Sequence, residues 1–425
     1  DMEINGAKMF VKALQEEGVD TLFAYPGGTA IDLFDALYDA EGIDMILPRH
    51  EQALVHAADG YARSTGRVGV CLVTSGPGAT NLVTGIATAN YDSVPLVCFT
   101  GQVPLNLIGN DAFQEVDIVG ITRSICKYAV TVRKREDLAR IIKNAFYIAR
   151  TGKPGPVVVD IPKDIQLAMG SDEYPTEVNI RGYKPSEGVH VGQIKRALAE
   201  LKNAKKPVFL CGGGVNIAHA RKEMQELAEK TGIPVVTTIM GKGAIPTDHP
   251  LYVGNIGMHG NMASNKAIME SDVLFSIGCR FNDRITGTID TFAKNAKIIH
   301  VDIDAASISR NIKVDIPIVA DAKVAISKML EYAEPLDIKG WVDDIMNVKA
   351  EYPINMNRYD GVTPEAIIRT INDMYSNLIV TTDVGQNQLW TTQYIDIDEN
   401  KQLLTSGGLG TMGYGFPAAI GAKLG

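Results

Sequence analysis

The chain has 425 residues, 45% of them hydrophobic, which is enough for two or three domains with cores of their own. Its net charge is −9 and both signs are spread along the chain, so nucleic acid is not an expected partner. No apolar run approaches the roughly 18 residues that span a membrane, and no signal peptide is recognisable. The five cysteines form no CxxC pair, which is typical of reduced thiols. We therefore expect a cytoplasmic protein with no membrane partner.

Short apolar runs alternate with Gly-rich turns and helical sequence from Thr21 onward. Near-continuous apolar strands in such a pattern predict a parallel sheet covered by helices on both faces. We predict a first domain over residues 1–167 and a polar linker over 168–190. The strand-like runs are TLFAYPGG (21–28), DMILP (44–48), VGVCLVTSGPGATN (68–81), VPLVCFTGQ (94–102) and PGPVVVDIP (154–162).

The same pattern continues in two further stretches. A second domain is predicted over 191–334, a linker or linking helix over 335–360, and the opening of a third unit over 361–425. The predicted fold class is therefore α/β, with three consecutive doubly wound parallel-sheet domains. The runs that carry this prediction are PVFLCGGG (207–214), IPVVTTIMGKG (233–243), DVLFSIGCRF (272–281), KIIHVDID (297–304), NLIVTTDVGQNQLW (377–390) and LLTSGGLGTMGYGFPAAIGAKLG (403–425).

Glu51 stands in the first turn of a predicted helix that is rich in small residues. An acid at a helix start is common, because it interacts favourably with the helix dipole by under about 1 kcal/mol. Here Ala53, Ala57, Ala58 and Gly60 leave no bulky polar face, so the carboxyl group is predicted to be partly buried. A buried carboxylate needs a partner or takes up a proton. Glu51 is therefore a candidate for proton transfer.

Two glycine-containing turns follow strands of the second domain. Gly212–Gly214 would let a backbone approach a pyrophosphate at a helix N-terminus, but the spacing is not GxGxxG. A tight strand-to-helix turn explains these glycines equally well. The segment GCRFNDRITG (278–287) places Arg280, Asp283 and Arg284 after another strand, where α/β domains bind ligands. Two guanidinium groups there favour an anionic cofactor or a carboxylate substrate over a surface ion-pair loop.

A series of sequence blocks, in order along the whole chain, resembles acetohydroxyacid synthase, the thiamine-diphosphate catalytic subunit of acetolactate synthase. DAFQE and RFNDR within them point to the flavin-containing biosynthetic branch of that family. The blocks are YPGG (25–28), RHEQ (49–52), GYARSTGRVGVCLVTSGPGATN (60–81), TGQV (100–103), DAFQE (111–115), PGPVVVDIPKDIQ (154–166), GMHG (257–260), RFNDRITG (280–287), DVGQNQLW (383–390) and TSGGLGTMGYGFPAAIGA (405–422).

The resemblance implies an activity and a domain assignment. Residues 1–167 would bind the cofactor's pyrimidine, 191–334 would bind FAD, and 361–425 would begin the diphosphate-binding domain. The enzyme would decarboxylate pyruvate and join the hydroxyethyl unit to pyruvate or 2-ketobutyrate. The products, 2-acetolactate and 2-aceto-2-hydroxybutyrate, open the biosynthesis of isoleucine, valine and leucine. Thiamine diphosphate, Mg²⁺ and FAD are the implied cofactors.

The resemblance also implies an assembly. The family forms homodimers or tetramers, in which one chain's third domain and the neighbour's Glu51 complete a site, and a small regulatory subunit is an implied partner. Packing between helices rich in Ala and Gly suits such a symmetric contact.

Residue roles follow from the resemblance position by position. Glu51 would hydrogen-bond N1′ of the aminopyrimidine, and Gly28 and Gln114 would also act at the reacting centre. The implied thiamine-diphosphate positions are Tyr25, Pro26, Gly27, Glu51, Thr74, Pro77, Asn81, Gln386, Asn387, Gly410 and Met412. The implied flavin positions are Lys153, Gly212, Gly213, Gly214, Met258, His259, Gly278, Arg280, Asp302 and Asp321. The implied substrate positions are Phe113, Gln114, Lys163, Asp283 and Arg284, and no metal ligand is assigned.

The sequence departs from the family in several places. Lys153 stands where Arg is usual, Asn282 where Asp is usual and Asn387 where His is usual. Lys153 supplies charge but not a planar fork, which leaves FAD retention open. The family's Mg²⁺ segment, Gly-Asp-Gly ending in Asn, does not occur up to Gly425. We therefore expect a chain cut short in its third domain, which by itself does not make acetolactate.

Two alternatives stay open at this stage. One is a sister thiamine-diphosphate oxidase or decarboxylase of 2-ketoacids, against which DAFQE and the RFNDR loop argue. The other is a non-catalytic flavin-binding scaffold.

Overall fold

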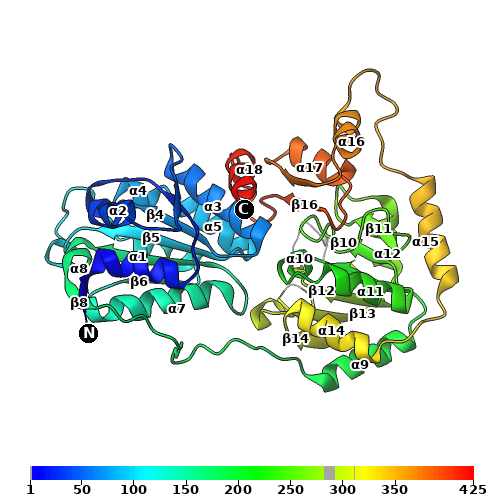
Figure 1. The fold of residues 1–425 in the computed structure, drawn as a ribbon. Coiled ribbons are helices and arrows are strands. Elements are labelled where there is room, and N and C mark those ends of the chain that lie inside the picture. The colour runs from blue at the N-terminus through cyan, green and yellow to red at the C-terminus, as the bar shows by residue number, and fades with distance from the viewer. Residues whose placement is uncertain (1, 282–291, 311) are drawn as a thin grey trace. The chain divides into compact units, whose positions relative to one another are not determined.

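The computed structural model describes residues 2–281, 292–310 and 312–425 (Figure 1). These residues form two compact units, which are described separately below. Unit 1 contains residues 1–185 and 408–425, and unit 2 contains residues 186–407. Compact units and family domains are different divisions of a chain, so the predicted domain boundaries stay predictions.

Unit 1 is built on a six-stranded parallel sheet with the order β3-β2-β4-β5-β7-β6. The three strands β4, β5 and β7 are buried along their whole length, as expected for a parallel sheet covered on both faces. Near the N-terminus, β1 pairs with β8 in a short antiparallel ladder, in which Glu3 lies opposite Ser171. The strands are β1 (Glu3–Asn5), β2 (Thr21–Ala24), β3 (Asp44–Ile46), β4 (Gly69–Val73), β5 (Leu96–Gln102), β6 (Tyr128–Thr131), β7 (Pro156–Pro162) and β8 (Met169–Ser171).

Alternate side chains of these strands enter two different cores. Leu72 and Phe99 pack with the helices α1, α2 and α7 on one face, whereas Cys71, Val73 and Cys98 pack with α3 and α5 on the other. This alternation is the period of two that a β-strand imposes. It confirms the predicted doubly wound α/β class for unit 1. The helices are α1 (Gly6–Glu16), α2 (Ile31–Tyr38), α3 (Glu51–Thr65), α4 (Pro77–Thr80), α5 (Val83–Asp92), α6 (Ile118–Thr122), α7 (Leu138–Arg150), α8 (Lys163–Leu167) and α18 (Gly415–Leu424).

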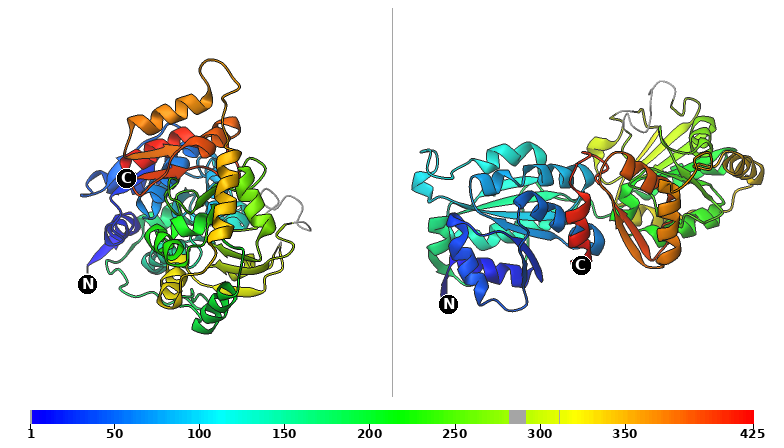
Figure 2. Two further views of the ribbon diagram at one scale, coloured as in Figure 1. Left: turned by 90° about the vertical axis from the view of Figure 1, so that its right-hand side faces the viewer. Right: turned by 90° about the horizontal axis from the view of Figure 1, so that it is seen from above.

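Helix α18 packs against α3, although some 350 residues separate them in sequence (Figures 1 and 2). A Cβ atom on Gly60 would lie 2.1 Å from the carbonyl oxygen of Ala418, and one on Gly421 would lie 1.7 Å from that of Ala57. No side chain fits at either position, so the two backbones touch directly. The small residues that the sequence showed in the Glu51 helix are therefore used for contact with α18 of the same chain.

A buried carboxylate ties together the ends of three strands in unit 1. Asp160 on β7 accepts hydrogen bonds from Thr100 Oγ1 at 2.7 Å, Gln102 Nε2 at 3.1 Å and Thr131 Oγ1 at 3.1 Å. Gln102 Nε2 also donates to the carbonyl of Val116 at 3.0 Å. Burial raises the pKa of Asp160 to about 6, although these hydrogen bonds oppose the rise.

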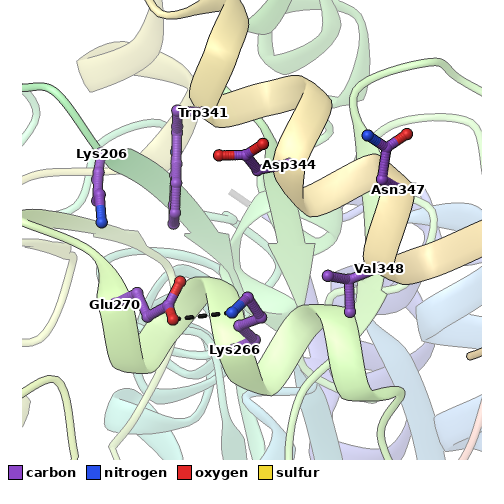
Figure 3. Close-up of a pocket in the computed structure, with 7 residues that line it drawn as sticks. All are labelled: Lys206, Lys266, Glu270, Trp341, Asp344, Asn347 and Val348. Atoms are coloured by element: carbon purple, nitrogen blue, oxygen red, sulfur yellow. Dashed lines mark hydrogen bonds and ion pairs between the residues drawn. The ribbon is translucent and has the colours of Figure 1, made fainter. Parts of the chain in front are cut away.

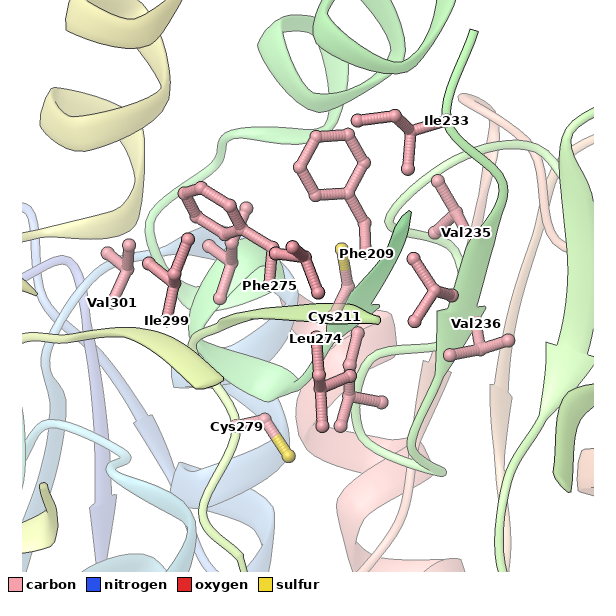
Figure 4. Close-up of a cluster of buried hydrophobic side chains, with 14 of the residues drawn as sticks. Phe209, Cys211, Ile233, Val235, Val236, Leu274, Phe275, Cys279, Ile299 and Val301 are labelled. Carbon is pink, nitrogen blue, oxygen red and sulfur yellow. The ribbon is translucent and has the colours of Figure 1, made fainter. Parts of the chain in front are cut away.

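Unit 2 contains a second six-stranded parallel sheet, with the order β11-β10-β9-β12-β13-β14. Counted from β9, this is the 3-2-1-4-5-6 order of dinucleotide-binding folds. Figure 4 shows its core, in which Phe209 and Phe275 pack edge to face with ring centroids 5.5 Å apart. The strands are β9 (Pro207–Cys211), β10 (Val235–Thr237), β11 (Tyr252–Asn255), β12 (Val273–Ile277), β13 (Lys297–Asp302) and β14 (Ile316–Val319).

The start of the predicted third domain belongs to unit 2. It contributes a two-stranded parallel sheet, β15 (Leu378–Thr381) with β16 (Lys401–Leu404), and two helices. Arg221 donates to the carbonyls of Asp398 and Lys401 and so holds this part on the central sheet's helices. The helices of unit 2 are α9 (Val191–Lys202), α10 (Gly213–Ile217), α11 (Arg221–Thr231), α12 (Met262–Glu270), α14 (Ala322–Tyr332), α15 (Lys339–Glu351), α16 (Pro364–Met374) and α17 (Gln386–Tyr394).

Within the described ranges, no helix combines the length and the apolar character that crossing a bilayer requires.

We predict that the stability of unit 1 depends on the protonation of Asp160. The folded pKa of about 6 lies above the roughly 3.9 of an unfolded aspartate, so folding takes up a proton between these values. The stabilising contribution is complete below about pH 4 and is lost as the pH rises through 6. Compared with Asp160→Asn, the unmodified protein should gain about 1 kcal/mol of unfolding free energy between pH 8 and pH 5. Urea unfolding at both pH values measures this, and parallel pH curves for the two proteins would contradict it.

Candidate functional site

The loops after β2 and β4 meet at the point where the strand order of unit 1 reverses. A Cβ atom on Gly27 would lie 2.4 Å from Cβ of Thr74, so the two loops are in contact. The hydroxyl groups of Thr29 and Thr74 are 3.0 Å apart, and Ser75 N donates to Thr29 Oγ1 at 3.0 Å. Ligands of open α/β sheets bind at such a switch point, outside the carboxyl ends of the strands. Six positions predicted from the sequence lie here: Tyr25, Pro26, Gly27 and Gly28 follow β2, Thr74 follows β4, and Pro77 is the first residue of α4.

Glu51 is the first residue of α3 and is half-buried, which confirms the partial burial predicted for it. The ring of His50 caps the helix by accepting a hydrogen bond from Gln52 N at 3.1 Å. Glu51 Oε2 accepts from Asn81 Nδ2 at 3.0 Å, and Glu51 Oε1 faces Gly78, where a Cβ atom would be 3.6 Å away. The carboxylate therefore has one fixed partner, at the end of α4, beside the β4 loop.

The loop that carries Phe113 and Gln114 touches the β4 loop. Gly76 has φ +62°, and a Cβ atom there would lie 2.6 Å from the carbonyl oxygen of Gln114. Gln114 itself has φ +57°, an uncommon value for a residue other than glycine. Phe113 is 87% exposed. Two predicted substrate positions thus lie at the Glu51 site. Gln114 is held there by its backbone contact with Gly76, and Phe113 precedes it in the chain.

The segment before α18, residues 408–414, contacts α3 and α5. Thr411 and Thr88 share a hydrogen bond of 2.6 Å, and the ring of Tyr414 packs edge to face against His56 at 5.6 Å. Gly425, at the end of α18, lies beside Ser64 near the end of α3. Gly410 and Met412, the latter 79% exposed, lie in the segment before α18.

The arrangement in unit 1 fits thiamine diphosphate. A Cβ atom on Gly28 or Gly410 would meet nothing within 4 Å, so a ligand can approach the backbone at both positions. Ser75 Oγ is buried between the two loops and has no hydrogen-bond partner among the described residues. An unsatisfied buried hydroxyl is unfavourable unless another group completes it. An aminopyrimidine with a charged tail would need an accessible backbone, a carboxylate and a polar atom that can hydrogen-bond to it. Gly28, Glu51 and Ser75 Oγ offer these three features.

Two lysines predicted for the site also lie in unit 1. Lys163 begins α8, and its Nζ atom is 3.9 Å from Asp32 Oδ2. In the same helix Gln166 Nε2 donates to the carbonyl of Thr29 at 2.8 Å, which ties α8 to the β2 loop. Lys153 Nζ donates to the carbonyl of Asn90 at 3.3 Å. Lys163 is therefore near the loops of the site, whereas Lys153 contacts the end of α5.

The second group of predicted positions gathers at the switch point of unit 2, between β9 and β12. A Cβ atom on Gly212 would be 2.4 Å from the carbonyl oxygen of Gly278, and one on Gly214 would be 2.6 Å from its Cα. Gly278 has φ +65° and Gly212 caps α10. Close packing of two turns thus explains these glycines. Gly213 lies between them, and a Cβ atom there would be 3.0 Å from Cβ of Met240.

The remaining flavin and substrate positions lie on the same unit, where the structure describes them. Asp302, at the end of β13, accepts from Asp304 N at 2.8 Å, and Asp321 caps α14 by accepting from Val324 N at 3.1 Å. Arg280 is exposed after β12, and Met258 and His259 are exposed after β11. Asp283 and Arg284 lie outside the described residues, as does Asn282.

Gln386 and Asn387 begin α17 in unit 2 and are exposed. Asn387 Oδ1 accepts from Asp383 N at 2.9 Å, so this side chain stabilises the turn that precedes its helix. Across the described part of the chain, no three His, Cys, Asp or Glu side chains are placed to hold a metal ion. No Mg²⁺ ligand is therefore assigned.

A hollow of about 280 Å³ lies between α12 and α15 on unit 2 (Figure 3). Three of its lining residues have fixed partners: Lys266 pairs with Glu270 at 2.9 Å, and Trp341 Nε1 donates to the carbonyl of Pro207 at 2.8 Å. None of the predicted site residues lines it. Its lining residues are Lys206, Lys266, Glu270, Trp341, Asp344, Asn347 and Val348.

Sequence reasoning missed several residues of the unit 1 site. Thr29, Ser75 and Gly78 stand inside or beside recognised blocks, so the blocks themselves were the available signal. Tyr414 also stands inside a block, TSGGLGTMGYGFPAAIGA (405–422). Thr88 had no such signal, because its contact with Thr411 joins distant segments.

We predict that Gly76→Ala disturbs the Gln114 loop. Both Gly76 and Gly109 have positive φ, and an alanine at either should cost roughly 1–2 kcal/mol. Only at Gly76 would the new Cβ also strike Gln114, which adds roughly 1–3 kcal/mol for overpacking. Amide exchange of residues 110–116 should rise in Gly76→Ala and stay near normal in the control Gly109→Ala, where the added atom meets open space. Equal exchange in both variants would contradict the contact.

Comparison with known families agrees with this layout. Residues 4–121 match the model of the thiamine pyrophosphate enzyme N-terminal TPP binding domain, 194–329 match the central domain and 383–425 match the C-terminal TPP binding domain. Thiamine pyrophosphate and TPP are other names for thiamine diphosphate. Glu51 and its neighbours fall in the first match, and the glycine turns of unit 2 fall in the second.

Similar proteins extend over nearly the whole chain. A probable acetolactate synthase large subunit from Methanococcus aeolicus is 49% identical, over 99% of this chain and 74% of its own. Another from Methanocaldococcus jannaschii is 49% identical over 99% of this chain and 73% of its own. The isozyme 3 large subunit of Escherichia coli is 46% identical, over 99% of this chain and 75% of its own. Taken with the three domain matches, these identities show that the chain belongs to the acetolactate synthase large-subunit family of thiamine-diphosphate enzymes.

Proposed function

We propose that this protein decarboxylates pyruvate and condenses the two-carbon unit with a second 2-ketoacid, giving 2-acetolactate or 2-aceto-2-hydroxybutyrate. The observation that carries this proposal is the half-buried Glu51 at the start of α3, paired with Asn81 and placed beside the β2 and β4 loops. Similarity to acetolactate synthase large subunits supports the same reaction. It would be the first step of branched-chain amino-acid biosynthesis, in the cytoplasm.

Thiamine diphosphate, when bound, supplies the carbon nucleophile and the electron sink for decarboxylation. Glu51 would hold and exchange a proton at the ring nitrogen of the cofactor's pyrimidine. The hydrogen bond from Asn81 fixes the direction of that carboxyl group, and half-burial limits competition from water. The Gly28 backbone, open to approach, and the exposed Met412 would orient the cofactor.

The substrate would meet the loop after β5. Gln114 has a polar side chain, and its backbone is fixed against Gly76. Phe113 offers an exposed apolar surface next to it, and Lys163 supplies a cation for a carboxylate. A 2-ketoacid needs both features, because it combines a short apolar end with an anionic one. Asp283 and Arg284 remain proposed acceptor residues by resemblance alone.

We also propose that unit 2 binds FAD at its switch point. The strand order of the central sheet supports this, since dinucleotides bind where that order reverses. The glycine turns after β9 and β12, with Asp302 at the end of β13, lie at that edge of the sheet. The net reaction moves no electrons out of the substrates, so the flavin would have a structural role. Mg²⁺ is proposed as the diphosphate's counter-ion by resemblance, and no residue is named for it.

Further partners are proposed from the relatives. They are named large subunits, which supports association with a small subunit. A homodimer or tetramer is proposed by resemblance, with Glu51 and the third domain contributed by different chains.

We predict that Glu51→Gln folds normally but loses about 10²–10⁴ in rate, because glutamine keeps an acceptor oxygen for Asn81 and cannot exchange a proton. The measurements are the acetolactate assay and hydrogen–deuterium exchange at C2 of bound thiamine diphosphate. Glu223→Gln, which changes a first-turn acid of α11 in unit 2, is the matched control and should stay within about twofold. An unchanged C2 exchange rate in Glu51→Gln would remove the role proposed for Glu51.

We predict that two inactive variants recover activity when mixed. If Glu51 and Met412 of different chains share a site, hybrids of Glu51→Gln with Met412→Asp contain one intact site. Random mixing should then restore about a quarter of the activity. Hybrid formation is verified by mass spectrometry. Verified hybrids without activity would show that each chain completes its own site, and an active monomer in sedimentation would contradict the dimer.

A further inference from the structure

A buried lysine of unit 2 has no role in the function proposed above. Lys242 follows β10, in the loop 238–243, and only 5% of it is exposed. Its Nζ atom donates a hydrogen bond to the carbonyl oxygen of Thr392, in the last turn of α17. Asn216 Nδ2 holds the same loop by donating to the carbonyls of Met240 at 2.9 Å and Lys242 at 3.2 Å. The lysine thus connects the central sheet to the start of the predicted third domain.

Packing alone does not explain a lysine at this position. Burial lowers the pKa of Lys242 to about 7, a shift that Asp396 opposes and Lys349 reinforces. Burial therefore disfavours the charged amine, so that lysine is less favourable here than an apolar side chain of similar length would be. What lysine offers and an apolar side chain lacks is the hydrogen bond to Thr392.

This hydrogen bond completes the C-terminus of α17. The last turn of a helix leaves carbonyl groups that have no partner inside the helix. Thr392 O accepts from Lys242 Nζ and also from Asn255 Nδ2 at 3.4 Å, and Tyr394 O accepts from Asn372 Nδ2 at 2.9 Å. At 3.4 Å the amide of Asn255 makes a weak hydrogen bond. Lys242 is therefore the main partner of Thr392, at the end of the helix where a cation is also favoured by the helix dipole.

The other end of α17 carries Gln386 and Asn387, two of the predicted thiamine-diphosphate positions. Both are exposed, and a Cβ atom on the preceding N-cap, Gly385, would meet nothing within 4 Å. The match to the C-terminal TPP binding domain begins just before this turn, at residue 383. N–H groups at the start of a helix attract anions such as phosphates. Because α17 has nine residues, its ends are only about 12 Å apart, and fixing the last turn also fixes the first.

We propose that Lys242 is a positioning residue: its amine holds the last turn of α17 against the loop after β10, and so fixes Gln386 and Asn387 for the diphosphate of the cofactor. Lys242 itself need not touch the cofactor or the substrate. The role rests on the proposed function, because α17 matters here as part of the thiamine-diphosphate site. It does not depend on which chain supplies Glu51, since Lys242 and α17 belong to the same unit of one chain.

The first experiment measures amide exchange of the cofactor-free protein. Lys242→Met keeps an unbranched apolar side chain and removes the amine. Exchange at residues 386–394 should rise about tenfold, because Thr392 O keeps only the long hydrogen bond from Asn255. The strands β9 and β12 should stay protected. Loss of their protection would show that the lysine supports the whole domain rather than the helix, and would contradict the proposal.

Lys349→Met is the matched control. Lys349, on α15, is a second lysine of unit 2 whose pKa is lowered by burial, and its Nζ atom donates to the carbonyl of Tyr252 at 2.5 Å. The variant removes the same kind of hydrogen bond, but from β11 instead of α17. It should leave exchange at residues 386–394 within about twofold of the unmodified protein. Equal exchange of α17 in the two variants would overturn the proposal.

A second measurement tests whether α17 acts on the diphosphate. Calorimetric titrations with Mg²⁺ present compare thiamine diphosphate with thiamine, which lacks the phosphates. Lys242→Met should bind thiamine diphosphate at least tenfold more weakly, because fewer molecules hold the helix in place, and should bind thiamine within about twofold of the unmodified protein. Equal weakening for both ligands would overturn the positioning role. Unchanged affinity for thiamine diphosphate despite faster exchange in α17 would overturn it as well.

This proposal and the proposed function fail separately. Amide exchange is read without cofactor, so failure of the role proposed for Glu51 would leave the results for α17 unaffected. At saturating thiamine diphosphate, Lys242→Met should exchange the C2 hydrogen within about twofold of the unmodified rate, whereas Glu51→Gln should not. Slow C2 exchange in saturated Lys242→Met would contradict a role that is confined to holding the diphosphate helix.

Discussion

Direct backbone contact between α3 and α18 is the constraint on which the unit 1 site depends. Glycine is required on both helices, at Gly60 and Gly421, because any side chain would meet a carbonyl oxygen of the other helix. This approach encloses Arg63 between them, so that a basic side chain of the last turn becomes part of a buried cluster. The segment before α18, which carries Gly410 and Met412, is attached to α3 and α5 at the same place.

The same rule of parallel sheets organises both units. Each six-stranded sheet has a position near its first strand where the strand order reverses, between β2 and β4 in unit 1 and between β9 and β12 in unit 2. Loops diverge at such a position and leave a crevice. In unit 1, hydroxyl and carboxylate groups line the loops around Thr74 and Glu51. In unit 2, the two turns are mainly glycine backbone packed on glycine backbone. The first arrangement suits proton exchange, and the second suits the close approach of a phosphate chain.

Local features of this fold are well predicted from the sequence, and distant ones are not. The strands of both sheets appear as apolar runs, and the burial of Glu51 follows from the small residues around it, since both depend on neighbours within a few positions. Arg63 and Asp59 look like an ordinary surface pair, because they are four residues apart on a helix. Their burial depends on Tyr414, 355 residues from Asp59, and no local pattern contains that information. Gly212–Gly214 similarly allowed two explanations, a phosphate-binding turn or a tight strand-to-helix turn. Only the distant Gly278, which packs against them, shows why the turn is tight.

Because α3 begins at Glu51, the positive end of its dipole lies beside the loops of the site. A helix N-terminus carries about half an elementary charge, which attracts anions locally. The chain as a whole has a net charge of −9, which repels small anions at long range. Within about a Debye length of the site, roughly 8 Å at physiological ionic strength, the local field dominates. Pyruvate would thus be repelled by the net charge at long range and attracted by the local field at the site. Because added salt screens both interactions, it should weaken the repulsion and the attraction together.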